Sequence, residues 1–296
     1  MKSPTTAATL VAMAVFHHDD IQIEYDVAGV GPAALLLHGF PQTRAMWGPI
    51  AEGLARDFTV ITADLRGYGA SSKPVASADL SNYAFRAMAS DMLALMRALG
   101  HERFHLVGHD RGARVAHRLS LDAPDRVMSL TVMDIVPTYD LLAHWSSDVS
   151  AAYFYWSYLA QPAPFPEHMI GADPDHFYEA CLLGWGGAKV SEFAAIEAYR
   201  MAWRDPATIA GMTNDYRAAL AVDVHHDAED IGRRFTGPAL VLYGAEGVMA
   251  RLFDVPGTWN GWLEAMSAEA IPGGHFFPDQ SPGETLGALR RFLGVG

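Results

Sequence analysis

Short, fully apolar runs alternate with stretches of helical periodicity along the first half of the chain. Each run has the length and composition of a strand that is buried on both faces. These runs are Ala33–Leu37, Phe58–Ala63, Phe104–Val107 and Val127–Met133. Apolar positions in 83–99 and 113–122 recur at helical spacing, and Gly100 can end the first of these two helices. Strands separated by helices predict an α/β fold, in which a mostly parallel, doubly wound sheet has helices on both faces.

The N-terminal region has a different pattern. Ile21–Val27 alternates apolar and polar residues, which is typical of an antiparallel strand at a sheet edge. Before it, one lysine and the apolar run Ala7–Phe16 faintly match a secretory signal, but the three residues directly before the polar residues 17–20 are not a small-x-small cleavage motif. We therefore expect a disordered leader that runs into a first strand, and a cytoplasmic protein.

After Pro137 the pattern becomes helical, with proline and glycine breaks and many Trp, Tyr and Met residues. The sheet pattern resumes at Pro238–Tyr243. A helical stretch near 257–266, a short strand ending at Ile271 and a helix over Glu284–Leu293 follow it.

This order predicts a sheet domain into which a helical cap is inserted. Residues 1–136 and 233–296 would form the core, and residues 137–232 would form the cap. The alternative is that the aromatic-rich insert adds a further layer to the core, which would use aromatic side chains equally well.

The composition of the chain excludes several classes of binding partner. The chain has 296 residues, a formal net charge of −13 and one cysteine, Cys181. Its acidic charge argues against a nucleic-acid partner, and a lone cysteine excludes an intramolecular disulfide and a cysteine-based zinc site. No apolar run is long enough to span a bilayer, so we expect no membrane partner. The segment 225–227, HHD, lacks a further ligand at a suitable spacing, and we expect a polar loop there and no metal site.

The segment 108–112 reads GHDRG, between a predicted strand and a predicted helix. A glycine–x–nucleophile–x–glycine pattern at such a turn is typical of a nucleophile elbow, here with Asp110 at the tip. The glycines permit the close backbone approach of a sharp turn. An aspartate there can attack carbon and form an ester, which needs a later hydrolysis step. The alternative is an ordinary turn between a strand and a helix.

Four segments occur in the order that is characteristic of the α/β-hydrolase superfamily. They are HGFP at 38–41, DLRGYG at 64–69, the elbow at 108–112 and GH at 274–275. The chain resembles the aspartate-nucleophile branch, which includes haloalkane dehalogenases, epoxide hydrolases and haloacetate dehalogenases. Three further segments are most similar to the haloacetate dehalogenases that act on fluoroacetate. They are HDRGAR at 109–114, DIVPTY at 134–139 and WSYLAQP at 156–162.

The resemblance implies a catalytic set. Asp110 would be the nucleophile, His275 the base that activates water, and Asp134 the acid that orients this histidine. Many relatives place the acid after a later strand, where this chain offers Glu246 as the alternative. His38 and His109 would be structural hydrogen-bonding residues.

Arg111 and Arg114 are three positions apart at the start of the predicted helix, so they can share a face beside the nucleophile. A pair of guanidinium groups binds a carboxylate through charge-assisted hydrogen bonds, which predicts an anionic substrate. The alternative is a solvated surface pair. The resemblance also implies that the backbone amides of Phe40 and Arg111 form the oxyanion hole.

The leaving halide needs hydrogen-bond donors from the cap. The resembled family uses a histidine, a tryptophan and a tyrosine. Trp156 and Tyr216 match two of these, whereas Tyr155 stands at the histidine position. A tyrosine donates one hydrogen bond but cannot become cationic. The preference among fluoride, chloride and bromide therefore stays open, as do the size and chirality of the acid, and these aromatics could instead form only the core of the cap.

The sequence thus predicts hydrolytic dehalogenation of short 2-haloacids such as haloacetates, fluoroacetate among them, to 2-hydroxy acids and halide. Water would be the second reactant, and no metal or organic cofactor is needed. The resemblance implies a homodimer. The main alternative is an epoxide hydrolase with the same acid–base set and with Tyr155 and Tyr216 as proton donors, although the two arginines argue against it. A receptor that kept the fold is disfavoured because Asp110, Asp134 and His275 are all present.

Overall fold

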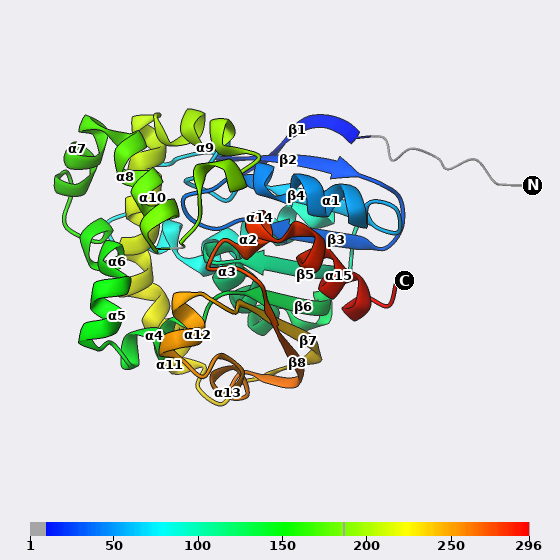
Figure 1. Ribbon diagram of the computed structural model, residues 1–296. Helices are drawn as coiled ribbons and strands as arrows, with labels where there is room; N and C mark the ends of the chain where they lie inside the picture. The colour runs from blue at the N-terminus through cyan, green and yellow to red at the C-terminus, as the bar shows by residue number, and fades with distance from the viewer. Residues whose placement is uncertain (1–9, 186, 296) are drawn as a thin grey trace, which may run out of the picture.

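An eight-stranded sheet forms the centre of the computed structural model, which describes residues 10–185 and 187–295 (Figure 1). The strands lie in the order β1-β2-β4-β3-β5-β6-β7-β8. β2 pairs antiparallel with β1 and β4, and all other neighbours pair in parallel. The strands are β1 (Leu10–His18), β2 (Ile21–Ala28), β3 (Ala33–Leu37), β4 (Thr59–Ala63), β5 (Phe104–His109), β6 (Val127–Met133), β7 (Phe235–Gly244) and β8 (Leu263–Ile271).

Helices connect most of the strands, and a separate group of helices lies between β6 and β7. The helices are α1 (Gly48–Leu54), α2 (Phe85–Ala98), α3 (Arg111–Asp122), α4 (Thr138–Ala143), α5 (Ser147–Ala152), α6 (Phe154–Leu159), α7 (Phe165–Ala172), α8 (Pro174–Ala180), α9 (Ile196–Trp203), α10 (Pro206–Ala218), α11 (Val224–Glu229), α12 (Val248–Leu252), α13 (Val255–Trp259), α14 (Phe277–Gln280) and α15 (Pro282–Phe292). Across the two described ranges, we find no helix with the length and apolar character that a membrane crossing requires.

Both faces of the sheet are covered by helices (Figure 1). α1 and α15 pack against each other on one face, and α2 and α3 pack against each other on the opposite face. All five residues of β3 are buried, because this strand has a neighbour on each side and a helical layer on each face. Its wholly apolar sequence reflects that central place. The predicted α/β fold with a mostly parallel, doubly wound sheet is confirmed.

The prediction of an edge strand at Ile21–Val27 was wrong. β2, which contains these residues, lies between β1 and β4. β1 takes the edge position, and it includes residues 10–16 of the predicted leader. The alternation of apolar and polar residues in β2 therefore belongs to an antiparallel strand that has a neighbouring strand on each side. The rest of the predicted leader, residues 1–9, lies outside the described residues.

The prediction of one helical stretch over 257–266 was also wrong. α13 ends at Trp259, and β8 begins at Leu263, which pairs with Phe235 of β7. Because β8 pairs with β7 from one end to the other, β8 begins earlier than the short strand that the sequence predicts. The residues of β8 alternate poorly, so only the sheet register reveals where the strand begins.

Helices α4 to α11 gather together at one end of the sheet (Figure 1). We use the name cap for residues 137–232, the limits that the sequence predicts. Buried aromatic rings hold these helices together. Tyr178 stacks on Trp203 with 5.3 Å between ring centroids, and Trp156 meets Tyr216 edge-on at the same distance. The aromatic residues of this segment thus form the interior of the cap.

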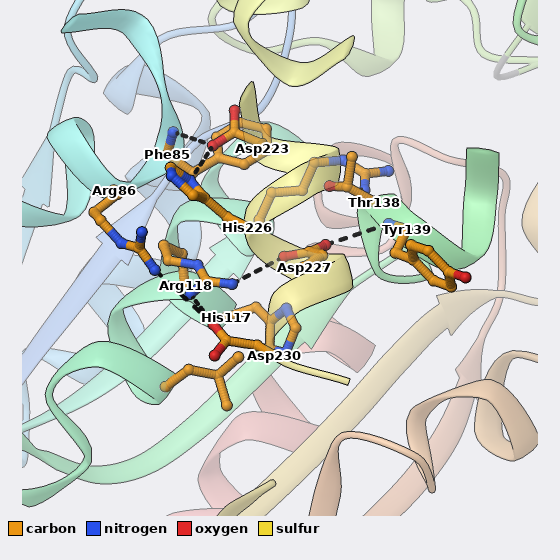
Figure 2. A network of polar contacts seen from close by, with 12 residues as sticks. Phe85, Arg86, His117, Arg118, Thr138, Tyr139, Asp223, His226, Asp227 and Asp230 are labelled. Atoms are coloured by element: carbon orange, nitrogen blue, oxygen red, sulfur yellow. Dashed lines mark hydrogen bonds and ion pairs between the residues drawn. The ribbon is translucent and has the colours of Figure 1, made fainter. Parts of the chain in front are cut away.

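A buried arginine on α3 connects both ends of the cap to the core (Figure 2). Arg118 donates to Asp227 at 3.0 Å and to Asp230 at 2.5 Å, near the C-terminal end of the cap. The other carboxylate oxygen of Asp227 accepts the amide N–H of Tyr139, at the start of the cap. The chain passes between the core and the cap at the two ends of the cap, and both of these connections lie around the guanidinium group of Arg118. The position of the cap therefore depends on α3.

Asp223 belongs to the same region and has a buried carboxyl group (Figure 2). The amide N–H of Phe85 donates to its Oδ1 at 2.9 Å, and its Oδ2 has no hydrogen-bond partner among the described residues. Burial raises the pKa of Asp223 to about 6, against the opposing effect of His226.

This raised pKa makes stability depend on pH. The native state keeps the proton of Asp223 up to about pH 6, whereas the unfolded chain loses it at about pH 4. The free energy of unfolding therefore falls as the pH rises between these values. We expect Asp223→Asn to remove this dependence and to increase the free energy of unfolding at pH 8 by on the order of 2 kcal/mol. Urea denaturation across this pH range measures it.

The matched control is Asp125→Asn, which changes an exposed carboxylate and should leave the pH dependence as it is. A pH dependence that is the same in the Asp223→Asn protein and in the wild type would contradict the assignment.

Candidate active site

The predicted elbow forms a sharp turn between β5 and α3, with Asp110 at its tip. The φ of Asp110 is +46°, in a region that residues with a side chain rarely adopt. A Cβ at Gly108 would lie 2.4 Å from the carbonyl oxygen of Gly112. A Cβ at Gly112 would lie 2.3 Å from the carbonyl oxygen of Leu37. Glycine is therefore required at both positions, because β3, β5 and α3 approach more closely than a side chain permits.

His275 lies between two carboxylates that come from the ends of different strands. Its Nδ1 is 2.6 Å from Oδ2 of Asp134, and its Nε2 is 3.9 Å from Oδ2 of Asp110. The other oxygen of Asp134 accepts the amide N–H of Gly244 at 2.8 Å. A proton on Nδ1, donated to Asp134, leaves the lone pair of Nε2 on the side of Asp110. The structure thus brings together the three residues predicted as a catalytic set.

Asp134, and not Glu246, is the acid beside this histidine. Asp134 directly follows β6, has a φ of +52° and is 1% exposed. Glu246 is exposed, and its backbone amide donates to the carbonyl oxygen of Gly273. The geometry therefore agrees with the choice of Asp134.

Asp110 is a buried carboxylate among donors and positive charges. The amide N–H of Phe40, one of the two predicted oxyanion-hole donors, donates to its Oδ1 at 2.9 Å. Burial by itself raises the pKa of Asp110, but His275 and Arg111 and further neighbours outweigh burial, so that the pKa lies below its usual value. Asp110 is therefore ionised at neutral pH, as a nucleophile must be.

Two buried histidines hold the loops around the elbow. The amide N–H of Leu65 donates to Nε2 of His38, and Nδ1 of His38 donates to the carbonyl oxygen of Gly39. Nε2 of His109 donates to the carbonyl oxygen of His275 at 2.8 Å. Burial lowers the pKa of His38, and it lowers the pKa of His109 to about 3. Both rings are neutral, and their contacts agree with the predicted structural role.

The two predicted carboxylate-binding arginines are buried beside the elbow, but Arg111 already has a carboxylate partner. Its Nε and Nη2 donate to the two oxygens of Asp215 at 2.8 and 2.5 Å. Arg114 has neutral partners instead, because its Nη1 donates to the carbonyl oxygen of Val136 and to the hydroxyl of Thr138. Nη1 of Arg111 and Nε of Arg114 are buried without a hydrogen-bond partner in the described part of the chain. The pair thus retains N–H groups for a further acceptor.

Aromatic rings of the cap pack around Phe40, next to Asp110. The ring of Tyr155 stacks on Phe40 with 5.7 Å between centroids. Tyr216 meets the rings of Tyr155 and Trp156 edge-on, at 5.9 and 5.3 Å. The buried Nε1 of Trp156 and the hydroxyl of Tyr216 have no hydrogen-bond partner among the residues that the structure describes. The three predicted halide-binding residues are therefore neighbours, and two of them retain an unused donor.

Sequence reasoning missed Asp215. This residue precedes Tyr216 in α10, and besides Arg111 it accepts the hydroxyl of Tyr68 at 2.6 Å. An acidic residue in a cap helix is usually solvated, so the sequence carries no signal that distinguishes it. Only the fold, which places α10 over the start of α3, reveals the buried pair.

The remaining candidates do not add a metal or thiol site. Among the described residues, no group of three or more His, Cys, Asp and Glu side chains could hold a metal ion. The segment 225–227 lies in α11, so the predicted polar loop was wrong, since Asp227 turns inward to Arg118. Burial raises the pKa of the Cys181 thiol to about 12, which leaves it without thiolate character at neutral pH.

The tight elbow gives a prediction for Gly112→Ala. We expect a decrease in the free energy of unfolding of about 1–3 kcal/mol, because the added methyl group overlaps the backbone at the end of β3. Gly171→Ala, in α7, is the matched control, since no atom lies within 4 Å of a methyl group there. Alanine favours a helix over glycine by up to about 1 kcal/mol, so the control should be at least as stable as the wild type. Urea denaturation compares the two, and an unchanged stability of Gly112→Ala would contradict the close approach.

Comparison with known proteins agrees with this geometry. The family model for the alpha/beta hydrolase fold matches residues 32–282. The chain is similar to a fluoroacetate dehalogenase from Burkholderia sp, with 53% identity over 276 residues that cover 93% of this chain and 91% of the relative.

Solved structures give the same result. A protein from Nostoc sp PCC 7120, provisionally identified as an alpha/beta hydrolase, matches with a TM-score of 0.93 and 42% identity over 95% of this chain and 97% of that chain. A protein from Pseudomonas aeruginosa, provisionally identified as an epoxide hydrolase, matches with a TM-score of 0.87 and 37% identity over 99% and 98%. The chain therefore belongs to the alpha/beta hydrolase family.

Proposed function

We propose that this protein is a hydrolytic dehalogenase of short 2-haloacids such as haloacetates, including fluoroacetate. The observation that carries the proposal is an ionised, buried Asp110 with His275 on one side and two buried arginines beside it. The relative with 53% identity is a fluoroacetate dehalogenase, which supports the same substrate class. The arginines suit a substrate that carries a carboxylate.

In the first step, Asp110 attacks the α-carbon of the haloacid. A bond forms between one carboxylate oxygen and this carbon, and the carbon–halogen bond breaks with its electron pair on the halide. The departing halide needs hydrogen-bond donors, which Nε1 of Trp156 and the hydroxyl of Tyr216 supply. Tyr155 lines the same cluster of rings. The arginines hold the carboxylate and offset its repulsion from the nucleophile.

In the second step, water attacks the carbonyl carbon of the ester. Nε2 of His275 takes the proton of this water, and Asp134 stabilises the imidazolium that forms. The amide of Phe40 donates to the carbonyl oxygen, which becomes negatively charged in the tetrahedral intermediate. The bond between the carbonyl carbon and the glycolate oxygen then breaks, and His275 returns its proton to the departing 2-hydroxy acid. No step requires a metal or an organic cofactor.

Epoxide hydrolysis is the second candidate. The ring centroids of Tyr155 and Tyr216 lie 5.9 Å apart, and a pair of tyrosine hydroxyls would be the proton donors to an epoxide oxygen. However, a neutral epoxide makes no use of Arg111 and Arg114. The similar protein with the epoxide hydrolase name is 37% identical, against 53% for the fluoroacetate dehalogenase. Dehalogenation is therefore the better supported reaction.

We also propose a cytoplasmic location and a homodimer. The first is supported by the acidic, disulfide-free composition, and the second by the resemblance to haloacetate dehalogenases.

Halide release from fluoroacetate, chloroacetate and bromoacetate tests the reaction. We expect release from wild-type protein and a loss of at least about a thousandfold in Asp110→Asn, because the amide cannot act as the nucleophile. Asp125→Asn is the matched control, since the same change at an exposed site should keep full activity. Release of chloride and bromide without fluoride would keep the reaction and place the limitation at Tyr155, Trp156 and Tyr216. No halide from any of the three acids would contradict the proposal, and diol formation from epoxides would then be measured.

A further inference from the structure

Asp215 occupies an unusual position for a cap carboxylate. Its side chain and that of Arg111 are both 0% exposed. Both of its oxygens accept from Arg111, its backbone carbonyl accepts a further bond from Nη2, and the hydroxyl of Tyr68 donates to Oδ2. A carboxylate with so many donors, removed from water, has a single defined orientation.

The same contacts define the orientation of Arg111. Its guanidinium carbon lies 4.2 Å from the ring centre of Tyr216 and 4.7 Å from that of Phe85. Two of its three nitrogens bond to Asp215, and Nη1 is the one without a partner among the described residues. Arg111 therefore presents a single nitrogen, Nη1, to an incoming acceptor, and the orientation of this nitrogen is fixed.

The net charge of the site also depends on Asp215. Within the part of the chain that the structure describes, Arg114 donates to the neutral oxygens of Val136 and Thr138, and burial together with Arg111 lowers its pKa. Asp215 is the carboxylate that offsets the charge of Arg111. Without it, two buried guanidinium groups would face an incoming anion together.

We propose that Asp215 is a positioning residue that directs Nη1 of Arg111 to the substrate carboxylate and limits how tightly the site holds anions. This inference rests on the proposed function, since it assigns the arginines to an anionic substrate. Its consequence is that removing the Asp215 charge tightens anion binding while it slows turnover. A residue that merely stabilised the fold would do neither.

The experiment compares Asp215→Asn with wild type in two measurements. Acetate, a non-reactive carboxylate, is titrated by calorimetry, and kcat and KM are measured with chloroacetate. We expect the acetate Kd to fall by about threefold to thirtyfold, since a nearby negative charge is lost. We expect kcat to fall by at least about tenfold, because Arg111 no longer holds the substrate in line. An unchanged or weaker acetate Kd, or an unchanged kcat, would overturn the proposal.

Two further variants separate position from charge. Asp215→Glu keeps the charge but displaces the carboxylate, so the acetate Kd should stay within about twofold of wild type while kcat falls. If Asp215→Asn does not fold, Asp215→Glu replaces it as the test of position. A wild-type kcat in Asp215→Glu would then overturn the proposal. Asp148→Asn is the matched control, because it removes an exposed cap carboxylate, in α5, in place of the buried carboxylate beside Arg111. It should change neither measurement, and an equal effect there would show that the response does not require the Arg111–Asp215 pair and would overturn the proposal.

The acetate titration needs no turnover. If wild-type protein releases no halide from haloacetates, the proposed function fails, whereas the titration still shows whether Asp215 controls anion binding.

Discussion

A carboxylate that is buried and yet ionised is the constraint on which this structure depends. Removal from water favours the neutral form of Asp110, and only nearby cations and donors reverse this effect. The strained backbone of the elbow holds the carboxylate among them, with Phe40 on one oxygen and His275 near the other. The sheet supplies these partners because the residues that follow parallel strands meet at one edge.

Helix α3 connects the elbow to the cap. Arg111, Arg114 and Arg118 lie three and four residues apart on the helix, and each reaches a different part of the cap or its first connection. Arg118 holds both ends of the cap (Figure 2), while Arg111 meets the helix that carries Tyr216. The helix that follows Asp110 therefore also contacts the cap helix that carries Tyr216.

The sequence predicted the elements that motifs and apolar runs define. The strand Val127–Met133 has the predicted bounds, and the elbow, Asp134 and His275 meet as expected. The errors have a physical cause in pairing and burial. β1 and the start of β8 depend on neighbours far along the chain, and Asp215 is distinguished only by its contact with Arg111. Local patterns carry no signal for such contacts.

The central claim is that water attacks the ester on Asp110 and not the substrate. A single turnover of chloroacetate with excess enzyme in water enriched in ¹⁸O tests it directly by mass spectrometry. The mechanism predicts that the label enters the Asp110 carboxylate and that the first glycolate is unlabelled, because its hydroxyl oxygen comes from Asp110. Label in the glycolate hydroxyl, with an unlabelled Asp110, would show direct displacement by water and contradict the mechanism.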